Sequence, residues 1–272
     1  MFRRRPHRPE SSAEVVPLSR TQLLAVLAGL LLVGGVLLYG LGYALVSSFS
    51  AGTAPDGGQS NAHAEADPAQ RRDLIAAAPM AEVAQDAGVA PGVAIALPPA
   101  IRLPAATSVG ATGVSTGFPR TPEGAVAQLA AIEVRVLSAM SLPLATEVYR
   151  DWALPGGVGA ADWSQTRNVQ SFLTHSRQAS KQLDPGTLVS VTPAAIQIKG
   201  TDGPDWVVAC VLLDVHAALK AEARMGYGTC ERMEWTGDRW LIGPGAPPAP
   251  APSTWPGSDA SVEAGWQPVA SN

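Results

Sequence analysis

Residues 206–217 read WVVACVLLDVHA, and this stretch decides the class of the fold. Every second position is apolar, as in a β-strand with one buried face: Val207, Ala209, Val211, Leu213 and Val215. Further strands are expected over residues 187–199, 222–235 and 240–242. Pro193 predicts a bulge or an edge in the first of these, and TGDR at 236–239 is typical of a tight hairpin turn. The C-terminal half therefore predicts an antiparallel sheet.

Helical patterns precede these strands. Thr121, Pro122 and Glu123 form a helix start signal, and the apolar residues that follow as far as Met140 lie on one broad helical stripe. Shorter helices are expected over residues 141–152 and about 160–179. Three helices followed by antiparallel strands predict an α+β domain over residues 118–243, with the helices packed on one face of a curved, cone-like sheet.

The two cysteines fall on successive strands of this sheet. A turn near residues 219–220 sets Cys210 directly opposite Cys230, and opposed residues have Cα atoms about 4.5–5.5 Å apart, which suits a disulfide. We favour a disulfide over the two alternatives, which are free buried thiols and a metal site. A metal site would need further ligands, and the chain has only four histidines. No metal and no cofactor is expected.

Four aromatic residues are candidates for lining a pocket between helices and sheet, although core packing is the competing interpretation: Trp152, Trp163, Tyr227 and Trp235. The hairpin register sets the last of them opposite Trp240 as a cross-strand aromatic pair.

Polar residues that could take part in catalysis are few. Asp214, His216 and Arg224 form a polar cluster on the strand face opposite the apolar stripe, and we interpret it as a surface charge cluster. The chain contains no Gly-x-Ser-x-Gly, Walker or His-Glu-x-x-His motif, so no catalytic residue is expected. Acidic and basic residues nearly balance over residues 118–243, which argues against nucleic-acid binding.

The segments on either side of this domain are poor in the residues that build a core. Residues 47–117 are rich in Ala, Gly, Pro, Ser and Thr, and we expect a low-complexity, disordered linker. Within it, Asp67 and Pro79 bracket a short helix predicted over residues 67–78, which is either transient or a docking segment for a partner. Residues 244–272 form a Pro-rich segment, and this composition predicts a disordered tail.

Two tryptophans in this tail are unusual for a disordered segment. Trp255 and Trp266 would dock either on the tail's own domain or on a partner.

Residues 23–46, LLAVLAGLLLVGGVLLYGLGYALV, contain no charged residue and predict a transmembrane helix, since a helix of this length crosses a hydrocarbon core of about 30 Å. Small residues four apart in this segment would let two spans pair, so the spacing allows a homo-oligomer without fixing the oligomeric state. Residues 1–22 are a basic tail that is expected to stay in the cytoplasm and to leave the C-terminal domain outside. Five arginines set this topology: Arg3, Arg4, Arg5, Arg8 and Arg20.

Several motifs carry a resemblance to a known family: GFPRTPEGAVAQLAAIEVRVLSAM (117–140), WALPGG (152–157), KGTDGPDWVVACVLLDV (199–215), YGTCERMEW (227–235) and PAPSTWPG (250–257). They resemble uncharacterised single-span membrane proteins of high-GC Gram-positive bacteria, many encoded on integrative conjugative elements. The layout is also similar to inner-membrane scaffold proteins of type IV secretion systems, whose outer domain has the nuclear-transport-factor-two-like fold.

These resemblances imply a non-enzymatic component of a conjugative transfer or secretion apparatus in the cell membrane, with a single pass and a cytoplasmic N-terminus. Its expected partners are the membrane and other envelope or transfer-machine proteins, but not nucleic acid. The alternative is a ligand-binding or enzymatic cone domain tethered to the envelope.

Overall fold

The computed structural model describes residues 67–178, 180–218 and 222–270, which belong to one compact unit. The predicted span at 23–46, the basic tail at 1–22 and the linker up to residue 66 lie outside these residues. Among the residues described, no helix combines the length and the hydrophobicity that crossing a bilayer requires.

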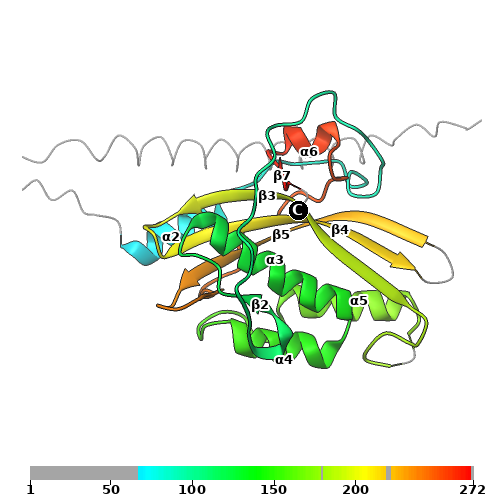
Figure 1. Cartoon of the computed structure of the whole chain (residues 1–272), viewed down its shortest axis with the longest axis horizontal. Coiled ribbons are helices and arrows are strands. Elements are labelled where there is room, and N and C mark those ends of the chain that lie inside the picture. The colour runs from blue at the N-terminus through cyan, green and yellow to red at the C-terminus, as the bar shows by residue number, and fades with distance from the viewer. Residues whose placement is uncertain (1–66, 179, 219–221, 271–272) are drawn as a thin grey trace, which may run out of the picture. The chain divides into compact units, whose positions relative to one another are not determined.

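The described unit has the α+β class that the sequence predicts, with helices packed on an antiparallel sheet (Figure 1). The helices are α2 Pro68–Ala77, α3 Pro122–Ala139, α4 Leu142–Trp152, α5 Ser164–His175 and α6 Asp259–Glu263, with the short 3₁₀ turn η1 Ala111–Gly113. The strands are β1 Ser108–Val109, β2 Ser115–Thr116, β3 Leu188–Thr201, β4 Trp206–Ala218, β5 Glu222–Trp235, β6 Trp240–Ile242 and β7 Gln267–Pro268.

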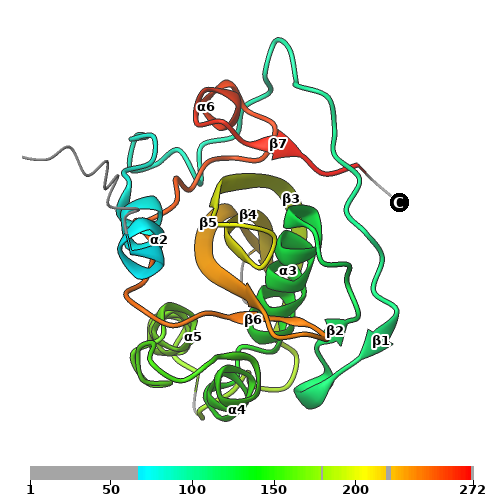
Figure 2. The same cartoon turned by 90° about the vertical axis from the view of Figure 1, so that its left-hand side faces the viewer.

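The main sheet has the strand order β6-β5-β4-β3-β7 with every neighbour antiparallel. It curves around α3, as Figure 2 shows. The register shifts next to Pro193, so the predicted bulge is confirmed. Trp235 pairs with Trp240 across the hairpin, with the ring centroids 5.5 Å apart, and this predicted pair is also confirmed.

The first two of the three predicted helices begin at their predicted capping residues. The Thr121 side chain accepts a hydrogen bond from the Gly124 amide at the start of α3, and the helix ends at Met140, whose φ is 41°. Ser141 caps α4 in the same way. The third helix is shorter than expected, because α5 begins only at Ser164 and ends at His175. All three helices enclose one hydrophobic core with the apolar stripe of β4.

The second face of the sheet is also buried, whereas the sequence pattern predicted a sheet with one buried face. On β4 the residues between the apolar stripe positions are themselves apolar and at most 1% exposed: Trp206, Val208, Cys210 and Leu212. They form a second core with side chains from α2 and from the C-terminal segment, including Ala76 and Trp266. A strand that is apolar on both faces needs a cover on both, because leaving either face in water forfeits its burial free energy.

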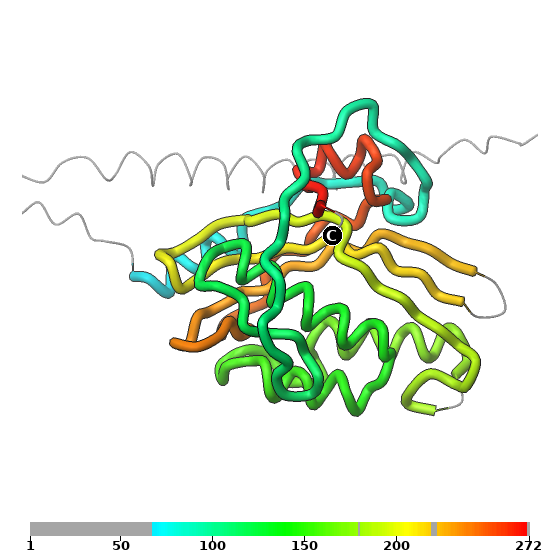
Figure 3. The backbone as a smooth tube through the Cα atoms, viewed as in Figure 1, coloured from blue at the N-terminus to red at the C-terminus, as the bar shows by residue number. Residues whose placement is uncertain are grey.

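The covering segments come from the two regions that were expected to be low-complexity or disordered, and this expectation is wrong for residues 79–117 and 244–270. In Figure 3 the chain between α2 and α3 runs past α6 and then on to α4. The C-terminal segment crosses β5 at Gly226 and Gly228, where a Cβ would overlap the carbonyl oxygens of Thr254 and Pro252. Trp266 donates its indole N–H to the Pro252 carbonyl at 3.1 Å. The folded domain therefore extends well beyond the predicted boundaries of 118 and 243.

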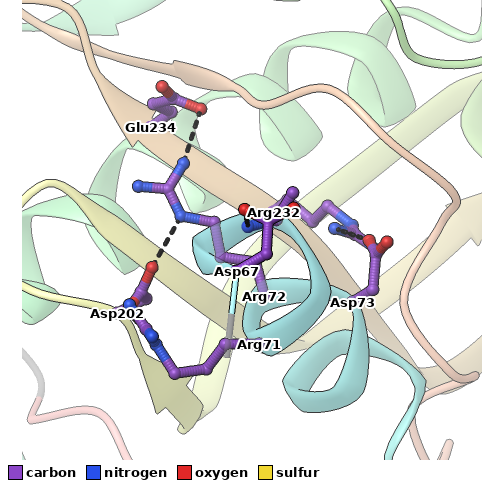
Figure 4. Close-up of polar contacts among 8 residues, drawn as sticks. Asp67, Arg71, Arg72, Asp73, Asp202, Arg232 and Glu234 are labelled. Carbon is purple, nitrogen blue, oxygen red and sulfur yellow. Dashed lines mark hydrogen bonds and ion pairs between the residues drawn. The ribbon is translucent and has the colours of Figure 1, made fainter. Parts of the chain in front are cut away.

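Helix α2 docks on its own domain rather than standing free in a spacer (Figure 4). Arg71 and Arg72 donate to the two carboxylate oxygens of Asp202, at 2.7 and 2.8 Å. These hydrogen bonds hold the pKa of Asp202 below its usual range. Asp73 accepts from Arg232 on β5 at 2.8 Å. The predicted helix at 67–78 is confirmed, including its Asp67 cap, and its docking surface is the sheet of the same chain.

Candidate functional site

A cavity of about 560 Å³ lies between α5, the C-terminal end of α3 and the paired strands β4 and β5. Its walls are mainly apolar side chains: Val89, Leu137, Met140, Phe172, Val215, Ala217, Ala223 and Met225. Its polar lining residues are Asn168, Ser171, His175, Ser176, Arg224 and Tyr227. A concave apolar space with a few polar groups is the usual form of a ligand-binding site.

A hydrogen-bond network adjoins the cavity at Tyr227. The phenol oxygen accepts hydrogen bonds from the side-chain amides of Asn168, at 2.8 Å, and Gln165, at 3.3 Å. The same Gln165 amide lies 3.0 Å from a Glu133 carboxylate oxygen and 3.1 Å from the Thr229 hydroxyl. Burial raises the pKa of Tyr227 to about 12, and the nearby Glu133 charge acts in the same direction. The phenol therefore keeps its proton at physiological pH.

Glu133 of this network and the nearby Glu231 are two buried carboxyl groups. Burial raises the pKa of Glu133 well above its usual range, and the charge of Glu231 adds to the effect. One oxygen of Glu133 has no hydrogen-bond partner. Glu231 accepts from the indole N–H of Trp163 at 2.8 Å, and burial raises its pKa to about 7, against the opposing effects of this hydrogen bond and of the Arg232 charge. Each group is held in the interior with few compensating donors, which favours its neutral form.

The four predicted pocket residues do not converge on one pocket. Tyr227 lines the large cavity, whereas Trp163 lines a separate space of about 60 Å³ next to Glu231. Trp152 is fully buried in the helix-side core, where its indole N–H donates to the Ala111 carbonyl at 3.2 Å. Trp235 packs against its hairpin partner. The core interpretation thus holds for Trp152 and Trp235.

The sequence did carry a signal for the network residues that were missed. Glu133 lies within the apolar stripe of α3, at helical spacing between Leu129 and Leu137, so its side chain is directed into the core. Thr229 and Glu231 share a strand face with Tyr227 and are likewise buried among apolar neighbours. A charged residue inside a buried apolar pattern indicates a buried network.

The polar cluster of Asp214, His216 and Arg224 lies on β4 and β5. Arg224 donates two hydrogen bonds to Asp214, at 2.9 and 2.7 Å, and the His216 ring lies 3.2 Å from the same carboxylate. Partial burial opposes ionisation of Asp214, but the bonds from Arg224 outweigh it and leave its pKa below the usual range. The Arg224 guanidinium also stacks 4.5 Å from the Trp255 ring. The cluster thus holds the C-terminal segment, and Trp255 docks on its own domain.

Cys210 and Cys230 form the predicted disulfide, and they are directly paired in the register of β4 and β5. The bond lies in the second core, between the sheet and the segments that cover it. Within residues 67–178, 180–218 and 222–270, no group of three or more His, Cys, Asp or Glu side chains is placed to hold a metal ion.

Comparison of the chain with protein-family models, with curated proteins and with solved structures finds no match.

Proposed function

We propose that this chain is a non-enzymatic, membrane-anchored scaffold in a conjugative transfer or secretion apparatus, with its folded domain outside the cell membrane. In this proposal residues 23–46 are the single span, and the five N-terminal arginines keep residues 1–22 in the cytoplasm. The disulfide is consistent with an oxidising compartment outside the membrane, because disulfides persist there and are rare in the cytosol.

The observation that carries the scaffold role is an exposed apolar loop at residues 89–97. Its aliphatic side chains face solvent to an unusual extent, with 87% exposure at Val93 and 97% at Ile95. The whole stretch from Ala87 to Ile101 has no charged residue. Exposed apolar patches of this kind mark sites of association. A partner that covered these side chains would remove them from water, which is the main driving force of protein association.

Hydrogen bonds to the C-terminal segment fix the backbone of the apolar loop. The Ala94 amide donates to the Gly257 carbonyl at 2.8 Å, and the Ile95 amide donates to the Asp259 carboxylate at 3.2 Å. Because its backbone is already ordered, binding through the loop costs less conformational entropy. Residues 87–101 contain no Lys, Arg or aromatic residue, and these are the residues that anchor loops at membrane interfaces. We therefore assign the loop to a protein partner in the same apparatus.

A transfer assay in a strain that lacks this chain tests the proposal. The double variant Val93→Ser/Ile95→Ser should reduce transfer strongly while the protein stays folded and abundant. Leu188→Ser is the matched control, because Leu188 is 66% exposed on a different element. His216→Ala should also leave transfer nearly intact. Full transfer by the loop variant would contradict the proposal, and so would loss of transfer in a folded His216→Ala protein.

A second candidate function, ligand binding by the domain, is favoured by one specific observation, the cavity beside Tyr227. The two functions are compatible, because the loop and the cavity use different side chains apart from Val89, which borders both.

A further inference from the structure

The cavity beside Tyr227 has no role in the scaffold proposal, and it could hold a ligand whether or not the chain is a scaffold. Protein interiors are close-packed and leave few spaces larger than a water molecule. A space of about 560 Å³ with walls of Leu, Met, Phe, Val and Ala side chains falls in the size range of small-molecule sites. Its chemistry indicates what kind of molecule would fill it.

The first polar feature of the cavity is a hydrogen-bond donor, the phenol O–H of Tyr227. Both hydrogen bonds to the Tyr227 oxygen come from amide N–H groups, of Asn168 and Gln165, and an amide N–H can only donate. The phenol oxygen is therefore the acceptor in both bonds, and its own O–H is left for the neighbouring Thr229 hydroxyl or for a bound molecule. Tyr227 lines the cavity, so a bound molecule can take this donor in place of Thr229, which keeps the Gln165 amide as a partner at 3.1 Å.

The second polar feature is an unused acceptor next to it. The two amide hydrogens of Asn168 go to the Tyr227 oxygen and, at 3.0 Å, to the Gln165 side-chain carbonyl. No hydrogen bond among the described residues uses the side-chain carbonyl oxygen of Asn168. Asn168 also lines the cavity. One donor and one acceptor on neighbouring side chains match a hydroxyl group, which accepts and donates at the same time.

The charges around the cavity argue against an anionic ligand, and no Asp or Glu in the described lining would balance a cationic one. Arg224 is the cation in the lining, and its guanidinium is already bonded to both oxygens of Asp214 and stacked on Trp255. The His175 ring nitrogen lies 2.8 Å from the Ser171 carbonyl on its own helix. An anionic head group would lose its hydration here without gaining a free cation in the described lining, which is unfavourable.

We propose that the cavity binds an uncharged aliphatic alcohol, with its chain against the apolar walls and its hydroxyl between the Tyr227 phenol and the Asn168 side-chain carbonyl oxygen. Such a molecule buries its apolar surface and satisfies both polar groups. No covalent step is involved.

Photolabelling of the full-length protein in lipid nanodiscs tests the proposal. The probe is a long-chain primary alcohol with a diazirine in its chain, and the labelled peptides are mapped by mass spectrometry. Labels should appear in α5 and β5, and Ala217→Phe, which fills the cavity, should lower this labelling about tenfold or more. Ala131→Phe is the matched control, because Ala131 lines a different cavity next to Pro193.

Tyr227→Phe tests the position of the head group and also covers the case in which the larger Ala217→Phe change disturbs folding. It removes the hydrogen bond proposed to the alcohol, together with those that the phenol accepts from Asn168 and Gln165, and should weaken labelling by the alcohol roughly three- to tenfold. Labelling by the matching diazirine alkane should not change. Labels confined to the proposed span at residues 23–46, or labels in α5 and β5 that persist unchanged in folded Ala217→Phe, would overturn the binding site. Equal alcohol labelling in wild type and Tyr227→Phe would overturn the head-group assignment.

Discussion

Replacing the buried carboxyl of Glu231 should change how stability depends on pH. Glu231 has an ordinary carboxyl pKa near 4.5 when exposed, and burial raises it to about 7 in the folded protein. Between these values the folded state holds a proton that the unfolded state has released. The free energy of unfolding therefore falls as pH rises through this window. A difference of about 2.5 pKa units corresponds to about 3 kcal/mol lost between about pH 4.5 and pH 7.

The substitution Glu231→Gln keeps an oxygen that can accept the Trp163 indole N–H but cannot ionise. Arg232 is not left unpaired, because it contacts Asp73 at 2.8 Å and donates to the Ala246 carbonyl at 2.7 Å. The variant should match wild type near pH 4.5 and exceed it by up to about 3 kcal/mol at pH 8. The raised pKa of Glu133 also makes the free energy of unfolding fall as pH rises. In the variant this free energy should therefore still fall with pH, but less steeply than in wild type.

Urea titrations at several pH values, followed by tryptophan fluorescence, measure this difference. The signal reports the folded unit alone, because all seven tryptophans lie within the described residues. Glu147→Gln, an exposed change on α4, controls for the altered net charge. If wild type and Glu231→Gln lose stability in parallel between pH 5 and 8, Glu231 is ionised throughout and the burial argument is wrong.

Three further predictions test the topology, the disulfide and the C-terminal segment. Ser271→Cys in intact cells should react with a membrane-impermeant thiol reagent, since the C-terminus is expected outside; reaction only after lysis would refute this orientation. Non-reduced protein from the envelope should yield one cross-linked peptide pair containing Cys210 and Cys230, and replacing both with Ser should cost about 3 kcal/mol for the 20-residue separation; two alkylatable thiols in native protein would argue against the bond. Gly226→Ala should destabilise the fold by about 1–3 kcal/mol, because the new Cβ overlaps the Thr254 carbonyl; unchanged stability would mean that the segment does not pack on β5 in solution.

The parts of the fold that the sequence predicted are those that depend on local pattern. The alternation along residues 206–217, the Thr121 cap and the turn at 236–239 each act within a few residues, and each produced the expected element. The disulfide followed from the same strand register.

The covering segments could not be predicted in this way, because their order comes from surfaces far away in the sequence. Residues 244–270 read as a Pro-rich tail, yet Trp266 becomes buried against the second face of β4. The better clue was on the sheet itself, where residues 226–228 read GYG: glycine inside a strand indicates the close approach of another backbone.

The candidate site was predicted only in part for a similar reason. Tyr227 was placed at a pocket correctly, but its partner Asn168 lies 59 residues away and carries no motif of its own. The contact exists only because α5 packs over β5, and the sequence specifies that packing through many small apolar contacts rather than through one spacing.

Site-specific photo-cross-linking tests the scaffold role most directly. A photoreactive phenylalanine analogue replaces Ile95 in one strain and Leu188 in another, and both are irradiated in living cells with and without the genes of the transfer apparatus. Cross-links from position 95 to another envelope protein should appear only when the apparatus is present, and position 188 should not give them. Adducts to lipid alone at position 95, or the same cross-links at both positions, would contradict the scaffold assignment.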